Sequence, residues 1–196
     1  MIIWINGAFG AGKTQTAHEL HRRLENSYLY DPENAGYFIR KNTPSSTHKS
    51  DFQQYPMWRD MNYAMLKHLD EDYGGIIIAP MTLVDPLYFD EIVGRLRDNG
   101  ADVHHYALCA SETTIKKRLR SRGERPNCWA EQQMARCVSG LADARFGHHV
   151  DTEHSSVSEI AEQIAAMSKL SLLPDHRSKI KKAYDRVLTQ VKHIRF

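Results

Sequence analysis

The feature that most constrains this chain is a glycine-rich stretch of eight residues near its start. It reads Gly7-Ala8-Phe9-Gly10-Ala11-Gly12-Lys13-Thr14 and fits the phosphate-binding P-loop pattern of glycine, four residues, glycine, lysine, and serine or threonine. Residues 1–6 before it are apolar and rich in β-branched side chains, which predicts a buried parallel strand. Residues 15–25 after it carry apolar side chains at helical spacing and predict a helix. Strand, glycine loop and helix in this order are the context that the motif requires.

The stretch predicts a nucleotide cradle in which each residue type has a role. Glycines allow close backbone approach, and the N–H groups of the loop and of the following helix converge on an anion. We expect Lys13 to reach the β- and γ-phosphates and the Thr14 hydroxyl to ligate Mg²⁺. The predicted nucleotide-binding residues of the cradle are Gly7, Ala8, Phe9, Gly10, Ala11, Gly12, Lys13, Thr14 and Gln15. The sequence holds no Asn-Lys-x-Asp base-recognition pattern of the GTPase kind, so ATP is the expected nucleotide.

Strand and helix patterns alternate along the chain. The predicted strands are residues 1–6, 28–30, 75–79, 103–109 and 149–152, with helical patterns between them. Such alternation predicts an α/β protein of the P-loop NTPase fold, with a parallel five-stranded sheet and helices on both faces. Ligands of such sheets bind at the carboxyl ends of the strands, where the P-loop lies.

The length of 196 residues fits one such domain with small insertions. We predict a P-loop kinase-like domain over residues 1–174, of the nucleoside-kinase-like kind, with an arginine-bearing lid at about 120–136. Residues 175–196 are predicted to form a separate basic, amphipathic helix. Residues 33–50 are mostly polar and are predicted to be an irregular, mobile substrate loop.

Net charge and cysteine content narrow the classes of function. The formal net charge is +2, which argues against a broad nucleic-acid-binding surface. The three cysteines, Cys109, Cys128 and Cys137, lack metal-ligand spacing and fit a reducing compartment. No window reaches membrane-spanning length, and the apolar start belongs to a strand rather than to a signal segment. We therefore expect a cytoplasmic protein that acts on a small molecule.

The predicted third strand lacks the acidic residue that usually follows it and holds Mg²⁺, since it ends in Ala79-Pro80-Met81-Thr82. The candidate replacement is Asp31, at the end of the second strand, where an aspartate in small-molecule kinases can accept the proton of the substrate hydroxyl. The competing interpretation is an Asp31-Pro32 turn without chemistry. Both interpretations stay open, and Asp31 is a predicted catalytic and substrate-binding residue.

Arginines follow the fourth predicted strand at spacings that resemble those of a kinase lid. Arg118 and Arg122 are four residues apart and share one face of a predicted helix, and Arg136 lies further on. Guanidinium groups bind phosphate oxygens in pairs and stack on adenine. We predict that all three bind the nucleotide and that Arg118 and Arg122 also act in catalysis. The alternative is a solvated basic helix face.

Aromatic and basic side chains cluster before the third predicted strand, in the region that covers the acceptor substrate in this class of kinase. Besides Asp31, the predicted substrate-binding residues are Arg40, Phe52, Tyr55, Trp58 and Arg59. An amphiphilic or nucleoside-like ligand would suit this mixture. For Trp58, the competing interpretation is that it fills the core.

Residues 175–196 form a distinct electrostatic segment, with seven basic against two acidic side chains. Their apolar residues fall at helical spacing: Ile180, Tyr184, Val187, Leu188, Val191 and Ile194. One interpretation is a helix on the membrane surface, attracted to anionic lipid. The other, which we favour, is a terminal helix that packs its apolar stripe on the domain.

Across essentially its whole length, the sequence resembles the bacterial tunicamycin-resistance (TmrB-like) ATP-binding proteins. The resemblance starts with MIIWINGAFGAGKTQTA and with HRRL at residues 21–24. It continues with DP at 31–32, DFQ at 51–53, Pro56, WR at 58–59, PMT at 80–82, GRLR at 94–97, RLR at 118–120 and HIR at 193–195. It implies a P-loop kinase-like fold, ATP binding, and protection against tunicamycin, a nucleoside antibiotic with a fatty-acyl chain. It also implies peripheral contact with the inner membrane as an alternative to a purely cytoplasmic location.

Three functions are compatible with these features. The first is transfer of the ATP γ-phosphoryl group to a hydroxyl of tunicamycin or a related nucleoside-sugar, with ATP and Mg²⁺ as cofactors. The second is ATP-gated sequestration of the antibiotic without chemistry, at the membrane surface. The third is a generic small-molecule or nucleotide kinase. We favour the first, because cradle, lid arginines and second-strand aspartate occur together.

Overall fold

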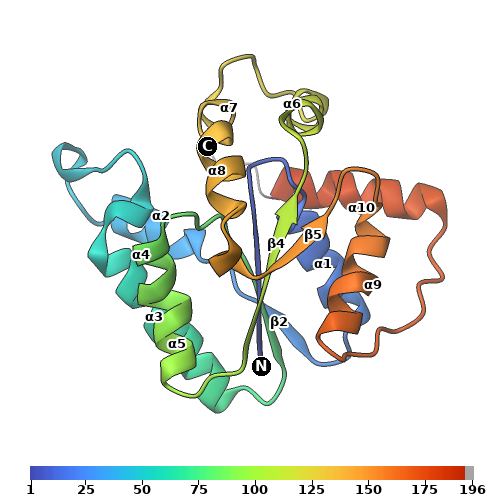
Figure 1. The fold of residues 1–196 in the computed structure, drawn as a ribbon, viewed down its shortest axis with the longest axis horizontal. Helices are drawn as coiled ribbons and strands as arrows, with labels where there is room; N and C mark the ends of the chain where they lie inside the picture. The colour runs from blue at the N-terminus through green and yellow to red at the C-terminus, as the bar shows by residue number, and fades with distance from the viewer. Residues whose placement is uncertain (193–196) are drawn as a thin grey trace.

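A computed structural model describes residues 1–192 of the chain. Its centre is a sheet of five strands in the order β2-β3-β1-β4-β5, in which all neighbouring strands are parallel (Figure 1). The strands are β1 Ile2–Gly7, β2 Ser27–Leu29, β3 Ile76–Pro80, β4 Val103–Cys109 and β5 His148–Asp151. The predicted parallel five-stranded sheet is therefore confirmed.

The central strand is β1, which is buried on both faces. All six of its residues are buried. It pairs with β3 on one side, with Ile2 opposite Ile77, and with β4 on the other, with Gly7 opposite Leu108. An apolar run without polar alternation is the pattern of a strand covered on both faces. The glycine loop therefore leaves the carboxyl end of the central strand, where ligands of parallel α/β sheets bind.

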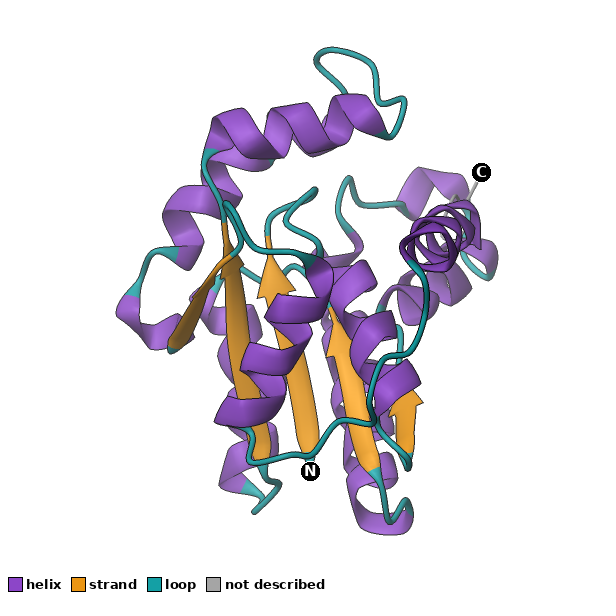
Figure 2. Ribbon diagram, turned by 90° about the vertical axis from the view of Figure 1, so that its right-hand side faces the viewer, coloured by secondary structure: helices purple, strands orange, loops and turns teal. Residues whose placement is uncertain are grey.

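Helices cover both faces of the sheet (Figure 2). The longer ones are α1 Lys13–Arg23, α2 Glu33–Lys41, α3 Pro56–Asp72, α6 Glu112–Ser121, α8 Met134–Leu141, α9 Val157–Met167 and α10 Lys179–Lys192. Short helical segments are η1 Ser45–Thr47, η2 Phe52–Gln54, α4 Pro86–Phe89, η3 Asp90–Gly94, α5 Arg95–Asp98, α7 Trp129–Gln132 and η4 Ala144–Phe146.

Two apolar cores hold these layers together. One lies between the sheet and α3, α5 and α8, with Leu66, Leu96 and Leu141 among its buried residues. The other lies between the sheet and α1 and α9, with Leu20 and Ile164 among its buried residues. Burial of each such side chain contributes about 1.5 to 3 kcal/mol, so the sheet is a rigid base for the loops at its carboxyl edge.

Several helices start at the capping residues that the sequence indicates. The side chain of Asp85 accepts backbone hydrogen bonds at the start of α4, and that of Ser111 does so for α6. Ser156 and Glu159 form a capping box at the start of α9, with both of its hydrogen bonds present. Each such cap contributes about 1 kcal/mol, so these helix starts are set by local chemistry.

The predicted irregular loop at residues 33–50 is wrong in its first part, because α2 occupies Glu33–Lys41. One face of α2 is buried through residues that include Gly36 and Ile39. Glycine lowers helix propensity by about 1 kcal/mol, which hides the helix in the sequence. The ring of Phe52 accounts for the glycine, since a Cβ at residue 36 would lie 2.5 Å from the Phe52 Cγ.

The favoured packing of the C-terminal apolar stripe on the domain is also wrong. On α10 the polar Asp185 and Thr189 are buried, whereas Ile180 and Tyr184 are 83% and 59% exposed. We call the exposed side chains Ile180, Tyr184, Val187 and Leu188 the α10 stripe. The predicted end of this helix, residues 193–196, lies outside the described residues.

A cluster of ion pairs fixes this orientation of α10. The Arg177 guanidinium contacts the carboxylates of Glu19 in α1, of Asp175, and of Asp185 in α10. Glu19 is 3% exposed, so its charge needs a partner inside the fold. Hydrogen bonds from Arg177 hold the pKa of Asp175 well below its usual range. Because unpaired buried carboxylates are costly, their pairing takes precedence over burial of the α10 stripe.

Candidate functional site

The glycine loop keeps a tight backbone path between β1 and α1. Gly12 is the N-cap of α1 at a φ of 105°, in the left-handed region that favours glycine, and it offers no side-chain cap. Gly7 is packed so closely that a Cβ there would lie 3.1 Å from Ala11 Cβ and from Leu108 Cβ. Neither position accepts a side chain without strain. The loop and the helix N-terminus together therefore suit an anion.

Lys13 folds back onto the loop that precedes it. Its Nζ donates hydrogen bonds to the carbonyl oxygens of Gly7 and Ala8, at 2.9 and 3.1 Å, and lies 5.3 Å from the centre of the Phe9 ring. Burial lowers the pKa of Lys13 to about 8. Neutral carbonyl groups are weaker partners for an ammonium group than an anionic oxygen, so a phosphate would displace them.

The lowered pKa of Lys13 predicts how nucleotide affinity depends on pH. A bound phosphate stabilises the ammonium form and raises the pKa in the complex. Affinity for MgATP should therefore be steady below pH 8, the pKa of Lys13 in the free protein. Above it, affinity should fall by up to about tenfold per pH unit, because binding then requires proton uptake. Calorimetric titration in two buffers of different ionisation enthalpy measures both the affinity and the number of protons taken up on binding. An affinity that rises with pH above pH 8 would contradict the prediction.

The exit of β3 holds the glycine loop by hydrogen bonds instead of presenting a carboxylate to it. Thr82 Oγ1 donates to the carbonyl oxygen of Gly7 at 2.8 Å. The Asn6 side chain accepts from the N–H groups of Gly7 and Leu83, each at 2.9 Å, and donates to the Leu83 carbonyl oxygen at 2.7 Å. Residues 80–84 contain no acidic side chain. The segment that follows β3 therefore presents no carboxylate to the glycine loop.

Arg122 and Arg118 take different places beside the loop. Arg122 lines a small cavity together with Lys13 and Thr14, and burial, followed by the charge of Arg118, lowers its pKa below the ordinary value. Arg118 donates to Thr152 Oγ1 at 3.1 Å and to the Thr152 carbonyl oxygen, which fixes it at the end of β5. Two guanidinium groups close together favour binding of an anion, because the anion offsets their mutual repulsion.

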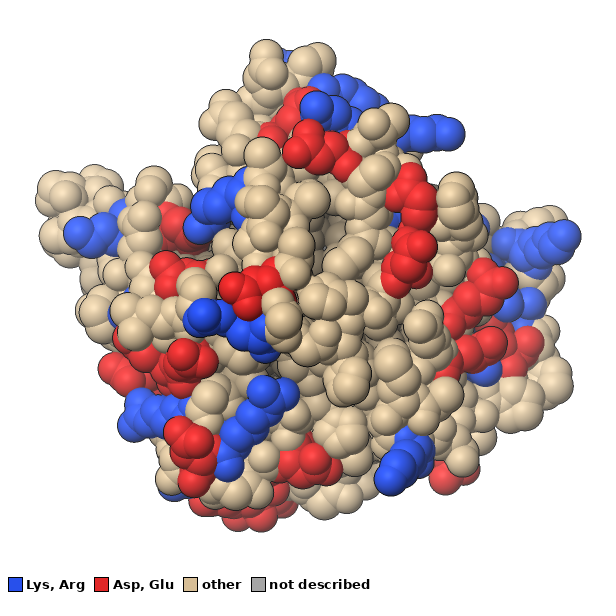
Figure 3. Space-filling view, in the orientation of Figure 1, with Lys and Arg blue, Asp and Glu red and all other residues tan. Residues whose placement is uncertain are grey.

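Two adjoining cavities open at the carboxyl edge of the sheet. The smaller, of about 140 Å³, has Lys13, Thr14 and Arg122 in its wall, and we call it the phosphate cavity. The large cavity, of about 590 Å³, lies between α2, η2 and the segment around α7. Both cavities are lined by Phe9, Glu33, Glu124 and Ala130. Figure 3 shows acidic and basic side chains interspersed over one face of the molecule.

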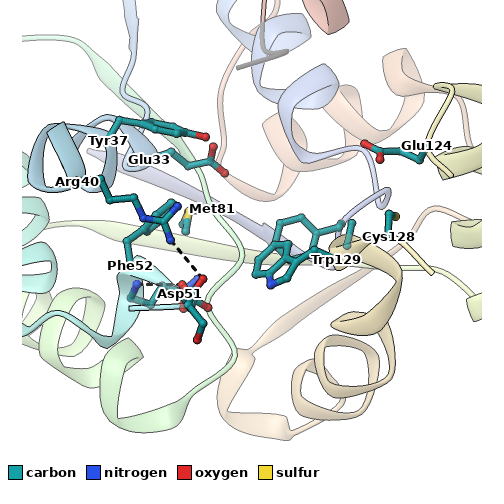
Figure 4. Close-up of a pocket in the computed structure, with 13 residues that line it drawn as sticks. Glu33, Tyr37, Arg40, Asp51, Phe52, Met81, Glu124, Cys128 and Trp129 are labelled. Carbon is teal, nitrogen blue, oxygen red and sulfur yellow. Dashed lines mark hydrogen bonds between the residues drawn. The ribbon is translucent and has the colours of Figure 1, made fainter. Parts of the chain in front are cut away.

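The large cavity has two facing walls (Figure 4). One wall carries Glu33, Tyr37, Arg40, Asp51 and Phe52, and the other carries Glu124, Cys128 and Trp129. Arg40 lies over the Phe52 ring at 5.5 Å and donates to the backbone oxygens of Lys49 and Ser50. Arg136 on α8 lies 3.7 Å from Asp51, outside both cavities, and links the two walls.

The predicted substrate-binding residues fall into two groups. Arg40 and Phe52 line the large cavity, whereas Tyr55, Trp58 and Arg59 are buried behind its wall. The indole N–H of Trp58, which is fully buried, donates to the Pro32 carbonyl oxygen at 3.0 Å. Arg59 is ion-paired with Glu91 and donates to the Gln53 carbonyl oxygen at 2.6 Å. We therefore expect Tyr55, Trp58 and Arg59 to hold the wall in place.

After β2, Glu33 at the start of α2 lines both cavities. Asp31 Oδ1 accepts a hydrogen bond from the Glu33 N–H at 3.0 Å, within the turn that starts α2, and Asp31 lines neither cavity. Sequence reasoning misses Glu33 because residues 33–50 read as a loop. The signal available in the sequence is that a second carboxylate, Glu33, follows Asp31 by two positions. Tyr37, Asp51, Glu124 and Trp129 carry no comparable signal, since only the fold brings them together.

The comparisons with known proteins agree with this geometry. A family model described as an AAA domain (AAA_33) matches residues 2–142. The solved structure of the Deinococcus radiodurans tunicamycin resistance protein is 34% identical to this chain. It superposes with a TM-score of 0.76 and covers 89% of this chain and 99% of its own. The chain belongs to the tunicamycin-resistance family. The sequence resemblance is thereby confirmed.

More distant structures share the fold. A gluconokinase from Sinorhizobium meliloti 1021 has 15% identity and a TM-score of 0.57, covering 84% of this chain and 89% of its own. A shikimate kinase from Acinetobacter baumannii, solved with shikimate, has 15% identity and a TM-score of 0.56, covering 86% and 92%. No curated protein matches the chain. These likenesses confirm the predicted P-loop kinase-like fold, which is a nucleotide-binding fold.

The residues of the phosphate cavity fit a magnesium ion that is held mainly by water and by the phosphates of a nucleotide. Within the described chain, no group of three or more His, Cys, Asp or Glu side chains is arranged to hold a metal ion. Mg²⁺ usually keeps several waters and takes one or two protein oxygens plus phosphate oxygens. The Thr14 hydroxyl, with Glu124 in the same cavity wall, would suit an ion bound in that way.

Proposed function

We propose that this protein confers tunicamycin resistance by transferring the γ-phosphoryl group of ATP to a hydroxyl of tunicamycin or of a related nucleoside-sugar. The observation that carries the proposal is the wall shared by the phosphate cavity and the large cavity. A nucleotide tail in one and an acceptor in the other would meet at that wall, and such proximity is a large part of phosphoryl-transfer catalysis. The 34% identity with the D. radiodurans tunicamycin resistance protein supports the choice of acceptor.

The residues of the phosphate cavity would stabilise the charge of the transferring group. Lys13 would move from its carbonyl partners to the β- and γ-phosphates, and Arg122 faces the same cavity. Arg118, held at Thr152, would support Arg122 from the preceding turn, the last of α6. Bound Mg²⁺ would neutralise charge on the phosphate oxygens, with the Thr14 hydroxyl as its protein ligand.

Glu33 would take the part that the sequence assigns to Asp31. The acceptor oxygen forms a bond to the γ-phosphorus while the bond from that phosphorus to the ADP oxygen breaks. The proton of the acceptor hydroxyl then passes to the Glu33 carboxylate, which lies in the wall between the two cavities. Asp31 would position Glu33 through the 3.0 Å hydrogen bond at the start of α2.

Incubation of the purified protein with MgATP and tunicamycin tests the proposed transfer. Mass spectrometry should show antibiotic that is heavier by one phosphoryl group, with one ADP formed per product molecule. A panel of nucleosides and sugars under the same conditions separates a tunicamycin kinase from a generic small-molecule kinase. Unaltered antibiotic that binds only in the presence of ATP would overturn the transfer and support ATP-gated sequestration instead.

We also propose peripheral contact of α10 with the anionic surface of the inner membrane. No helix within residues 1–192 is long and apolar enough to cross a bilayer. The α10 stripe, however, exposes Ile180, Tyr184 and Val187 by 83%, 59% and 57%. The exposed basic residues beside it are Lys179, Lys181 and Arg186. An outward apolar stripe flanked by basic side chains suits a helix in an anionic lipid surface, where each basic residue contributes about 1 kcal/mol.

Vesicle cosedimentation tests this contact. The protein should bind vesicles that contain phosphatidylglycerol and not vesicles of phosphatidylcholine alone, and added salt should weaken the binding. The double variant Ile180→Glu/Val187→Glu should bind these vesicles at least about tenfold more weakly, because it removes the apolar area that the lipid would bury and adds charge repulsion. Leu173→Glu, at a leucine that is 44% exposed outside α10, is the matched control. Undiminished binding of the double variant would contradict the contact.

A further inference from the structure

Trp129 differs from the other two tryptophans of the chain in its exposure. Trp4 and Trp58 are fully buried, whereas Trp129 is 45% exposed. It is the first residue of α7 and lines the large cavity, and its indole reaches into the space between the two walls (Figure 4). A large ring that faces a cavity instead of the core keeps apolar surface in water, which a ligand could cover.

The indole of Trp129 is held against the glycine loop. Its ring centre lies 4.9 Å from that of Phe9, with an angle of 69° between the ring planes, an edge-to-face contact. Phe9 in turn lies 5.3 Å from Lys13 Nζ. Such an aromatic pair contributes about 0.5 to 1.5 kcal/mol beyond area burial and fixes the ring direction. One contact thus orients the indole from the nucleotide side while the rest of the ring stays open to the large cavity.

Flat groups also occupy the facing wall. The rings of Phe52 and Tyr37 lie 6.0 Å apart, and the Arg40 guanidinium lies 5.5 Å from the Phe52 ring. Gln53 and Asp51 place polar side chains in the same wall. A space with flat rings on both sides and hydrogen-bonding groups at its edge matches a heteroaromatic base better than it matches a sugar or an acyl chain.

We propose that Trp129 is the specificity-determining residue of the large cavity and that it stacks on the nucleobase of a nucleoside-type acceptor. The inference rests on the proposed function only in taking this cavity for the acceptor site. The indole lines the large cavity and is absent from the wall around Lys13 and Thr14. We therefore assign the stacked base to the acceptor and not to ATP.

Acrylamide quenching of tryptophan fluorescence tests the stacking, because acrylamide reaches Trp129 and not the buried Trp4 and Trp58. The full chain is saturated with MgADP, which cannot donate a γ-phosphoryl group, and uridine is then added. Uridine should shield the emission from acrylamide, and N-acetylglucosamine should not. By calorimetry, Trp129→Leu should weaken uridine binding about 10- to 100-fold, as expected for loss of one stacked base.

Two further variants serve as controls for the stacking test. Trp129→Phe retains a ring and should restore most of the uridine affinity. Tyr184→Leu removes an aromatic ring of similar exposure on α10 and should leave the uridine affinity unchanged. Trp129→Leu should leave the MgADP affinity unchanged. The proposal is overturned if uridine leaves the quenching unchanged, if MgADP alone gives the whole shielding, or if Trp129→Leu binds uridine normally. No phosphoryl transfer takes place with MgADP, so this experiment measures stacking alone. Stacking can therefore be confirmed when phosphorylation fails, and phosphorylation can be confirmed when stacking fails.

Discussion

Replacing Lys13 with alanine should weaken MgATP binding by about 10- to 100-fold and lower the rate of phosphoryl transfer by a further factor of about 100 to 1000. The ammonium group sits in the loop at 2.9 and 3.1 Å from two carbonyl oxygens, where a phosphate would meet it. A charge-assisted hydrogen bond contributes about 1.5 to 3 kcal/mol to binding. The larger loss in rate arises because the charge of the transferring group is greatest in the transition state.

This variant should fold as well as the natural protein does. Burial lowers the pKa of Lys13 to about 8, below its value of 10.5 in an unfolded chain. The protonated lysine therefore destabilises the folded protein at neutral pH, and its removal relieves that cost. Thermal unfolding should show no loss of stability. Lys116→Ala, at a half-exposed lysine paired with Glu112 on α6, is the matched control. Unchanged MgATP affinity in the Lys13 variant would remove the basis of the proposed function.

The parts of the fold that the sequence predicts best are those fixed by neighbouring residues. β1, the glycine loop and α1 form one continuous segment, and each piece confirms the next. The caps at Asp85, Ser111 and Ser156 are likewise local, since each side chain bonds to N–H groups a few residues away. Alternation of strands and helices then leaves little choice of sheet, because crossovers between parallel strands are right-handed.

The predictions that fail depend on packing between distant segments. Gly36 reads as a helix breaker, and only the Phe52 ring against it shows why the helix needs a glycine there. On α10 the apolar stripe reads as the inward face. Pairing of Arg177 with Glu19, a residue 158 positions earlier in the chain, turns the other face inward. Neither the contact of residue 36 with the ring nor this ion pair leaves a periodic pattern in the sequence.

The candidate site shows the same division. The P-loop residues and Arg122 lie together at the phosphate cavity, as local motifs indicate. The large cavity is assembled from α2, the turn at Asp51, Met81 after β3, and the segment around Trp129. A cluster of aromatic residues in the sequence indicates the region that forms one wall of the large cavity. It does not tell which side chains face the cavity and which, like Trp58, hold the wall from behind.

Replacing Glu33 with glutamine should lower the turnover number for phosphoryl transfer by about 100- to 10,000-fold, the usual contribution of a positioned proton acceptor. The side chain keeps its size and loses its charge, so KM for MgATP should change little. Glu33 is suited to this part because it lines both cavities, at the wall where donor and acceptor would meet. Steady-state kinetics with tunicamycin as the acceptor measures both constants.

Asp31→Asn is the matched control for Glu33, because asparagine retains an oxygen that can accept the backbone hydrogen bond at the start of α2. It should cost less than about tenfold in turnover, whereas loss of a proton acceptor costs far more. The reverse result, an active Glu33→Gln protein beside an inactive Asp31→Asn protein, would assign the proton to Asp31.

The same pair of variants separates phosphorylation from sequestration of tunicamycin in cells. A kinase that loses Glu33 should lose protection against tunicamycin although it still binds MgATP, while a protein that only sequesters the antibiotic should continue to protect.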